Sequence, residues 1–577
     1  MAARRGVWLV LGLIAVASLL SAVGVWFTAS LAGRRASVPA STALVLRLDG
    51  DLGEVEGAGL FDRFVEGPAT VRVLIDAIGR AKTDRRVKGL VVEPVGGAPF
   101  WARSQEIRDA IVDFRKSGKK TIAYLEYGGE QEYFLATACE KVVLLPSSVL
   151  DLKGLATYEV FLRGAFDKVG ATPDFIHIGD YKTAINTFTQ KTFTPAHREM
   201  ATSLNHDAFD QLVQAIAVAR KKSPETVRAL IDEGPFIAED ALAAGLVDAL
   251  LYRDEVEEHI GLGNEDTTDF SDYVQALPPT FTLSARPKIA VIYAVGTIAS
   301  GDGRSGDIAG SDTLVEYINQ AADDRGVKAI VLRVDSPGGS SIASDVIWRA
   351  LMLAREDKPL IVSMGDLAAS GGYYIAMPGH VIVAQPGTLT GSIGIYTGKF
   401  AIGGTLEKFG ASIESVSEGK MAELDSPVRP FTDAERAKIE EQVQTFYDQF
   451  VTKVAEARKT TPEKIDAVAR GRVWTGRQAP KIGLVDELGG LDRAVAIARQ
   501  RAKIAPGADV ELVLYPPRQS LFDALSHPLG QTDESSLRSA LALFAPSERR
   551  VMRQVLAPMR LLGRREPLAL MPFIFTK

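Results

Sequence analysis

Cysteine is almost absent from this chain, because Cys139 is the only one among 577 residues. A single thiol excludes an intrachain disulfide framework and a metal site built from several cysteines. An excess of basic residues is also missing, since 66 Lys and Arg stand against 72 Asp and Glu and the net charge is -6. A nucleic-acid-binding protein usually has a basic footprint. We therefore expect no nucleic acid partner, and no motif indicates a metal ion, a nucleotide or another cofactor.

Long apolar runs are scarce, and the one that stands out is the uncharged segment 6–33, between Arg5 and Arg34. About 20 residues suffice to cross a bilayer, whereas the apolar part of a cleavable signal peptide covers only about 7–15. The sequence therefore predicts a retained transmembrane anchor. Arginines flank both of its ends, and the free amino terminus favours a cytoplasmic N-terminus. Most of the chain would then lie outside the cytoplasm.

After the anchor, predicted strands alternate with predicted helices. Strands are expected at residues 42–48, 87–92 and 120–124, with helical stretches at 71–82 and 104–117 between them. This alternation is typical of βαβ units with right-handed crossovers and a mostly parallel sheet. The predicted fold class is therefore α/β.

The same order of elements returns in the second half of the chain. Residues 324–331 repeat residues 84–91 at a spacing of 240, and residues 483–488 repeat residues 245–250 at a spacing of 238. Collinear matches at nearly one spacing indicate a duplicated domain. We predict four parts: an anchor (1–35), a first copy (36–275), a second copy (276–515) and a tail (516–577).

The predicted tail alternates apolar residues with clusters of arginine, among them Arg549-Arg550 and Arg564-Arg565. A basic amphipathic stretch can lie on a membrane surface. Packing against its own domain is the commoner outcome and the one that we favour here.

The two copies differ at Ser370. Residues 358–364 predict a buried strand and residues 372–377 a helix, so Ser370 lies at a strand-to-helix turn. The free N–H groups of a helix start favour negative charge that develops nearby, which suits a nucleophile, but Ser is also a common helix N-cap. At the equivalent place the first copy has Glu130, which would cap a helix as well. The difference therefore favours a catalytic role for Ser370 and leaves the capping role open.

A serine nucleophile needs a base, and none of the six histidines stands in a recognisable pairing with Ser370. A histidine remains open, because catalytic triads are spatial. A lysine can do the same work if burial lowers its pKa. Lys182 and Lys420 each follow a strand-like segment, at equivalent positions in the two copies. The pattern does not choose between them, and for both the ordinary alternative is a solvated lysine.

Five motifs together resemble the long-form signal peptide peptidase A (SppA) family, whose members are membrane-anchored serine–lysine proteases of the Clp/crotonase fold group. The resemblance extends from the anchor to about residue 515. It depends on Asp-Ser-Pro-Gly-Gly-Ser at 335–340, Ala-Ser-Gly-Gly-Tyr-Tyr at 369–374, Leu-Thr-Gly-Ser-Ile-Gly at 389–394, Gly-Arg-Val-Trp-Thr-Gly at 471–476 and Gly-Leu-Val-Asp at 483–486. It implies two tandem Clp/crotonase-like copies after one transmembrane helix.

The resemblance also assigns roles to residues. It implies that Ser370 is the nucleophile, that Lys182, in Tyr-Lys-Thr-Ala, is the general base and acid, and that Ser392 orients the lysine. Backbone N–H groups of Gly338 or Gly339, together with that of Gly371, would hold the oxyanion.

The chain departs from the family pattern near the lysine. Asp180 replaces a lysine, and Asn186-Thr187 replace Glu-Pro. An acid close to Lys182 would raise the pKa of the lysine and oppose its role as a base.

The function implied is a serine endopeptidase on the periplasmic side of a bacterial inner membrane, held in the lipid by its anchor. Its substrates would be cleaved signal peptides and other extended apolar peptides, which could bind as an added strand. The family forms homo-oligomers, and we expect a tetramer. Two alternatives are a catalytically degenerate membrane scaffold of the same fold and acyl-CoA chemistry of the crotonase type.

Overall fold

The computed structural model describes residues 38–49, 52–55, 70–96, 101–263, 265–277, 286–303, 308–517, 567–571 and 575–576. The predicted anchor and most of the predicted tail lie outside these residues. Within the described part of the chain, no helix combines the length and apolar character that a membrane span needs.

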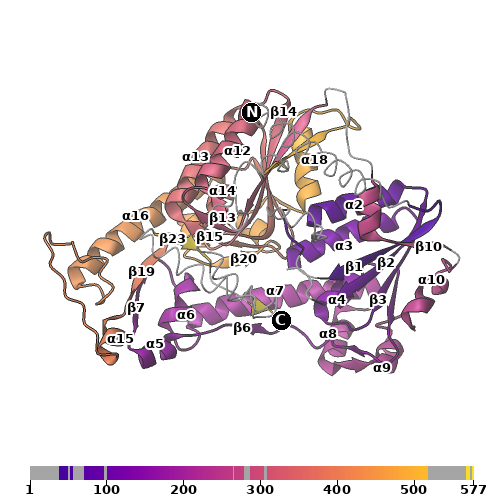
Figure 1. The fold of residues 1–577 in the computed structure, drawn as a ribbon, viewed down its shortest axis with the longest axis horizontal. Coiled ribbons are helices and arrows are strands. Elements are labelled where there is room, and N and C mark those ends of the chain that lie inside the picture. The colour runs from indigo at the N-terminus through magenta and orange to yellow at the C-terminus, as the bar shows by residue number, and fades with distance from the viewer. Residues whose placement is uncertain are drawn as a thin grey trace, which may run out of the picture.

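The first half of the chain builds a six-stranded sheet whose neighbours all run parallel (Figure 1). In spatial order the strands are β10 (Asp266–Asp269), β1 (Thr42–Asp49), β2 (Val87–Val95), β3 (Lys120–Leu125), β4 (Lys141–Leu144) and β9 (Ala249–Leu250). The α/β class predicted from alternating elements is thus confirmed.

The second half repeats this strand order in a sheet of its own. Its corresponding strands are β22 (Glu511–Tyr515), β11 (Lys288–Val295), β14 (Val327–Ser336), β16 (Leu360–Ala369), β17 (Val381–Ala384) and β21 (Glu487–Leu488). Here β16 also pairs with β18 (Leu389–Gly391), which continues to the antiparallel β20 (Val473–Thr475). The end of β16 is therefore surrounded by short strands, and this is where Ser370 lies.

Helices cover the sheets in equivalent places in the two halves. The first half has α2 (Val71–Thr83), α3 (Trp101–Arg115), α4 (Glu130–Ala136) and α7 (Pro195–Arg220), and the second has α12 (Ser311–Asp323), α13 (Ser341–Asp357), α14 (Gly371–Ala376) and α16 (Asp433–Ala457). On the other face of the second sheet lies α18 (Leu491–Arg501), where the first half has the shorter α10 (Val256–His259).

Alternate residues of the central strands pack into different cores, because successive side chains of a strand point to opposite faces. On β11, Ala290 and Ile292 belong to a large core under α12 and α13, whereas Ile289 and Val291 pack with α18. A parallel strand covered on both faces reads as a continuous apolar run, as β11 does.

A third sheet joins the two halves. Its strand order is β13 (Ile308–Gly310), β12 (Thr297–Ala299), β15 (Gly338–Ser340), β23 (Leu568–Leu570), β19 (Tyr396–Ala401) and β7 (Thr172–His177). The antiparallel pairing of β7 from the first half with β19 from the second runs from Ala401↔Thr172 to Tyr396↔His177. Figure 1 shows the two strands side by side, away from both parallel sheets. Because of this pairing, the residues that follow β7 in the sequence lie against the second half.

Candidate active site

Ser370 occupies the turn predicted from the sequence, between the end of β16 and the start of α14. Its backbone has φ +56° and ψ -112°, an uncommon conformation for a residue with a side chain, and such strain is found preferentially at functional sites. Its N–H donates to the carbonyl of Gly391 at 2.7 Å. Its side chain makes no hydrogen bond to the N–H groups at the start of α14. The hydroxyl of Ser370 is therefore not a cap of this helix.

Lys182 reaches Ser370 from the other half of the chain. Its Nζ lies 2.7 Å from Ser370 Oγ, and it donates to the carbonyl oxygen of Ser392 at 3.0 Å and to Ser392 Oγ at 3.1 Å. All three residues are completely buried. The structure therefore brings together three side chains that lie up to 210 positions apart in the sequence.

Burial lowers the pKa of Lys182 well below the usual value of 10.5. Desolvation disfavours the charged ammonium, and no carboxylate offsets this effect. From the sequence we expected Asp180 to raise the pKa if its carboxylate lay close. Asp180 does not raise this pKa, since burial alone causes the shift at Lys182 and the side chain of Asp180 is exposed to solvent. Lys182 is thus suited to be a neutral amine that accepts a proton.

A loop of the second half closes over the lysine. A Cβ added to Gly471 would lie 2.4 Å from the backbone N and Cα of Lys182, so only glycine permits this approach. Gly471 N–H donates to the carbonyl of Ile393 at 2.8 Å, and Ser392 N–H donates to that of Arg472 at 2.7 Å. These bonds tie the loop to the segment that contains Ser392, next to the buried Lys182.

The glycines predicted to hold an oxyanion lie next to Ser370. A Cβ added to Gly338 would lie 2.7 Å from the backbone nitrogen of Gly371. Gly338 has φ +101°, a conformation that favours glycine, and its own N–H donates to Ser336 Oγ at 3.1 Å. Gly339 follows it in β15, beside Ile298 of β12.

The strand β23, from the predicted tail, lies between β15 and β19. It pairs antiparallel with β15 in the register Gly338↔Leu570 and Gly339↔Ala569. The carbonyl oxygen of Ala569 lies close to both glycine turns, because a Cβ added to Gly338 would be 2.0 Å from it and one added to Gly371 would be 3.1 Å from it. Residues 567–571 thus pack on the protein. Sequence reasoning missed their position, since three apolar residues carry no signal of their partner.

Side chains on the two faces of β23 enter different apolar clusters. Leu568 and Leu570 are buried with Phe175, Phe188 and Tyr396, whereas Ala569 faces the core of the second half. An extended segment is thus held by main-chain pairing and by apolar pockets for alternate side chains.

The other candidates named from the sequence lie elsewhere. Lys420 is in an exposed segment. Glu130 begins α4 of the first half, and its Oε1 accepts the N–H groups of Lys153 at 2.9 Å and Gly154 at 3.0 Å. Among the described residues, no histidine is hydrogen-bonded to Ser370, so none stands as its base.

Comparison with known proteins identifies relatives of this chain. A sequence model described as "Peptidase family S49" matches residues 113–262 and 353–505, one segment in each half. The chain is 38% identical to "Serine protease SPPA, chloroplastic" of Arabidopsis thaliana, over 78% of this chain and 68% of that protein. It is 34% identical to "Protease 4" of Salmonella typhi, over 93% of this chain and 90% of that protein, and 31% identical to "Protease 4" of Haemophilus influenzae, over 74% and 72%.

The depressed pKa of Lys182 predicts a pH-dependent difference in stability between the natural chain and Lys182→Met. Between the folded-state pKa and 10.5, the unfolded lysine holds a proton that the folded one lacks. Raising the pH through this window should therefore stabilise the natural chain relative to Lys182→Met, by up to about 1.4 kcal/mol per pH unit. Thermal and denaturant unfolding of both proteins from about pH 7 to pH 10 measures the difference, and a constant difference would contradict the depressed pKa.

Proposed function

Because the chain belongs to peptidase family S49, we propose that it is an SppA-type serine endopeptidase with Ser370 as nucleophile and Lys182 as general base and acid. The observation that carries the proposal is the 2.7 Å contact between Lys182 Nζ and Ser370 Oγ. Both residues are buried, and burial lowers the pKa of the lysine. A general base must lie within hydrogen-bond reach of the proton it takes, and this lysine does.

The proposed reaction proceeds through an acyl-enzyme. Lys182 takes the proton of Ser370 while Oγ attacks the scissile carbonyl carbon. The oxyanion that forms accepts hydrogen bonds from the backbone N–H of Gly371 and of Gly339, or of Gly338 once that group leaves Ser336. Lys182 then gives the proton to the departing amine, and a water molecule, activated by the same lysine, hydrolyses the ester. Ser392, which accepts from Nζ through its hydroxyl and its carbonyl, keeps the amine aimed at Oγ.

The proposed substrates are extended apolar peptides, including cleaved signal peptides. A peptide would bind where β23 lies, pairing with β15 and β19 as an added strand. The substrate carbonyl in the position of Ala569 would then face Gly371. The substrate side chains on either side of it would enter the apolar cluster that holds Leu568 and Leu570.

The two halves are proposed to be tandem copies of a Clp/crotonase-like domain, at 36–275 and 276–515. The repeated strand order and the two segments matched by the family model support this. We further propose that residues 1–35 anchor the chain in a bacterial inner membrane with both copies on the periplasmic side. The uncharged run of the sequence supports the anchor.

We propose that the chain assembles into a head-to-tail tetramer. Residues 411–416 precede Lys420 as β7 precedes Lys182, yet they are exposed and belong to no described strand. In the first half, the place of β19 is taken by the region of β6 (Thr157–Tyr158), where Tyr158 and Val160 are exposed. If residues 411–416 of one copy pair with this region of the next, the intrachain β7–β19 contact is repeated between chains. A head-to-tail contact of this kind forms a ring when its rotation closes, here after four copies.

The assignment of Ser370 and Lys182 predicts which variants lose activity. Ser370→Ala and Lys182→Ala should each lower kcat for an apolar reporter peptide by about 10⁴-fold or more, since either removes a group that the chemistry needs. Lys420→Ala, the matched control, should stay within about twofold, because an exposed lysine contributes little.

A fluorophosphonate probe should add to Ser370, located by intact mass and peptide mapping. Absence of labelling and of hydrolysis would favour the scaffold or acyl-CoA alternatives. An inactive Lys420→Ala beside an active Lys182→Ala would show that the second half alone is the protease.

The proposed place of the substrate predicts competition with the tail. A chain that ends after residue 566 should cleave the reporter peptide faster than the full chain, and a synthetic peptide of residues 567–571 should inhibit the shortened chain competitively. The control is a chain that lacks only residues 575–577. Non-competitive inhibition would show that peptides do not bind where β23 lies.

The proposed assembly predicts the effect of charge at the exposed segment. Ile413→Asp with Val416→Asp should lower the mass measured by sedimentation from that of the oligomer toward that of one chain. Val218→Asp, on the exposed side of α7, is the control, since Val218 is 78% exposed and far from both proposed surfaces in the sequence. An unchanged mass in the double variant would contradict the proposed contact.

A further inference from the structure

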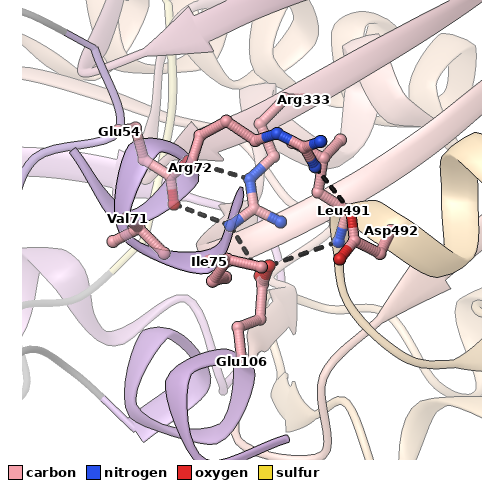
Figure 2. Close-up of a pocket in the computed structure, with 8 residues that line it drawn as sticks. All are labelled: Glu54, Val71, Arg72, Ile75, Glu106, Arg333, Leu491 and Asp492. Atoms are coloured by element: carbon pink, nitrogen blue, oxygen red, sulfur yellow. Dashed lines mark hydrogen bonds and ion pairs between the residues drawn. The ribbon is translucent and has the colours of Figure 1, made fainter. Parts of the chain in front are cut away.

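Buried charges lie where the two halves meet, and the proposed reaction does not use them. Figure 2 shows one group, in which Arg333 of β14 contacts Glu54 and Glu106. Arg333 Nη2 lies 2.7 Å from an oxygen of each carboxylate, and all three side chains are at most 4% exposed. These contacts join α3 and the segment after β1 to the second half.

A second buried arginine, Arg103, lies two positions after the start of α3. Its backbone N–H donates to Asp366 Oδ1 at 2.9 Å, and its Nε forms a further bond to the same carboxylate. Its Nη2 lies 3.8 Å from Asp335 Oδ2, and its Nη1 donates to the carbonyl of Leu52. The guanidinium of the first half therefore bridges two carboxylates of the second.

Both carboxylates belong to the segments that form the active site. Asp335 directly precedes the run Ser336 to Gly339, and Asp366 stands four positions before Ser370. The pairing of β14 with β16 changes register here, from Val334↔Met364 to Ser336↔Ala368. Two more residues are thus accommodated on β16 than on β14, which makes a bulge. Bulges are common next to active sites, where they re-aim side chains.

The bulge is closed by the bridged carboxylates. Asp335 Oδ1 accepts the N–H of Leu367, a residue of the bulge, at 2.9 Å. A Cβ added to Gly365 would lie 3.1 Å from the Asp335 side chain, so the two strands are in close contact at this point. Any movement of Asp335 relative to Asp366 would shift the glycine turn relative to Ser370.

We propose that Arg103, supplied by the half that also supplies Lys182, is a positioning residue for peptide hydrolysis. By bridging Asp335 and Asp366, it sets the distance between the glycine turn that holds the oxyanion and the turn that holds Ser370. The inference rests on the proposed function of Ser370 and the glycines. Arg103 itself does not contact the reacting atoms.

The charges around Asp335 favour an arginine at position 103. Burial raises the pKa of Asp335 to about 6, and Arg103 is the group that most opposes this rise, while Asp366 and Glu54 add to it. Without the guanidinium, two buried carboxylates would repel each other across the bulge. A planar guanidinium suits such a bridge because it offers several donors in fixed directions.

The test compares Arg103→Met, Arg103→Lys and the control Arg477→Met, which loses another ion pair between the halves, that with Asp207. In Arg103→Met, kcat should fall by about 100-fold, the size of effect seen when one oxyanion donor is lost, with KM changed by no more than about twofold. The inhibition constant of a peptide aldehyde, whose adduct with Ser370 resembles the tetrahedral intermediate, should rise by the same factor. Arg103→Lys should recover part of the loss, and Arg477→Met should behave like the natural chain.

A purely structural role would lower the folded fraction without changing aldehyde binding per folded molecule, so an unchanged inhibition constant in folded Arg103→Met overturns the proposal. If Arg103→Met does not fold, Asp335→Asn keeps an acceptor for Leu367 N–H while removing the attraction to Arg103. The Asp335→Asn variant should lower both kcat and the affinity for the aldehyde by about tenfold. If both quantities equal those of the natural chain, the proposal is overturned.

If the natural chain itself neither hydrolyses peptide nor reacts with the fluorophosphonate, the proposed function fails. If it does both and Arg103→Met matches it, only the positioning role fails.

Discussion

The main-chain pairing between β7 and β19 is the contact on which the site depends. Lys182 lies five positions after His177, the last residue of β7, and His177 is paired with Tyr396, close to Ser392 in the sequence. The pairing therefore fixes the lysine relative to both of its serine partners. Gly398 permits it, because a Cβ there would lie 2.5 Å from the carbonyl oxygen of Asp174. Loss of this pairing would separate the lysine from Ser370 even with both parallel sheets intact.

The cost of burying an amine explains the rest of the lysine's surroundings. An ammonium in an apolar site is strongly disfavoured, and a lysine shifts its pKa readily under these conditions. The neutral amine still needs hydrogen-bond partners, and Ser370 and Ser392 supply them. In the first half, Glu130 instead bonds the backbone of residues 153 and 154, so the equivalent turn is filled by a carboxylate with its own partners.

Local patterns in the sequence predicted the α/β class, a strand at 358–364 and a helix at 372–377. The structure has β16 at Leu360–Ala369 and α14 at Gly371–Ala376. These follow from short runs of apolar residues and from glycine, whose effects act within a few positions. The choice of Lys182 over Lys420 needed a family resemblance, because the two lysines follow similar segments and only the β7–β19 pairing separates them. No pattern in the sequence predicted that Arg103 is buried, because a polar residue near a helix start is usually solvated. Its burial depends on Asp335 and Asp366, more than 230 positions away.

The distance along the chain between β7 and β19 also has a consequence for biosynthesis. Residues 172–177 leave the ribosome more than 200 positions before residues 396–401, and contacts of such long range form late. Lys182 thus spends this interval without Ser370, so the proposed pair of lysine and serine is incomplete in a nascent first half. The ability to hydrolyse peptides would appear only after the second half has been translated and folded against the first.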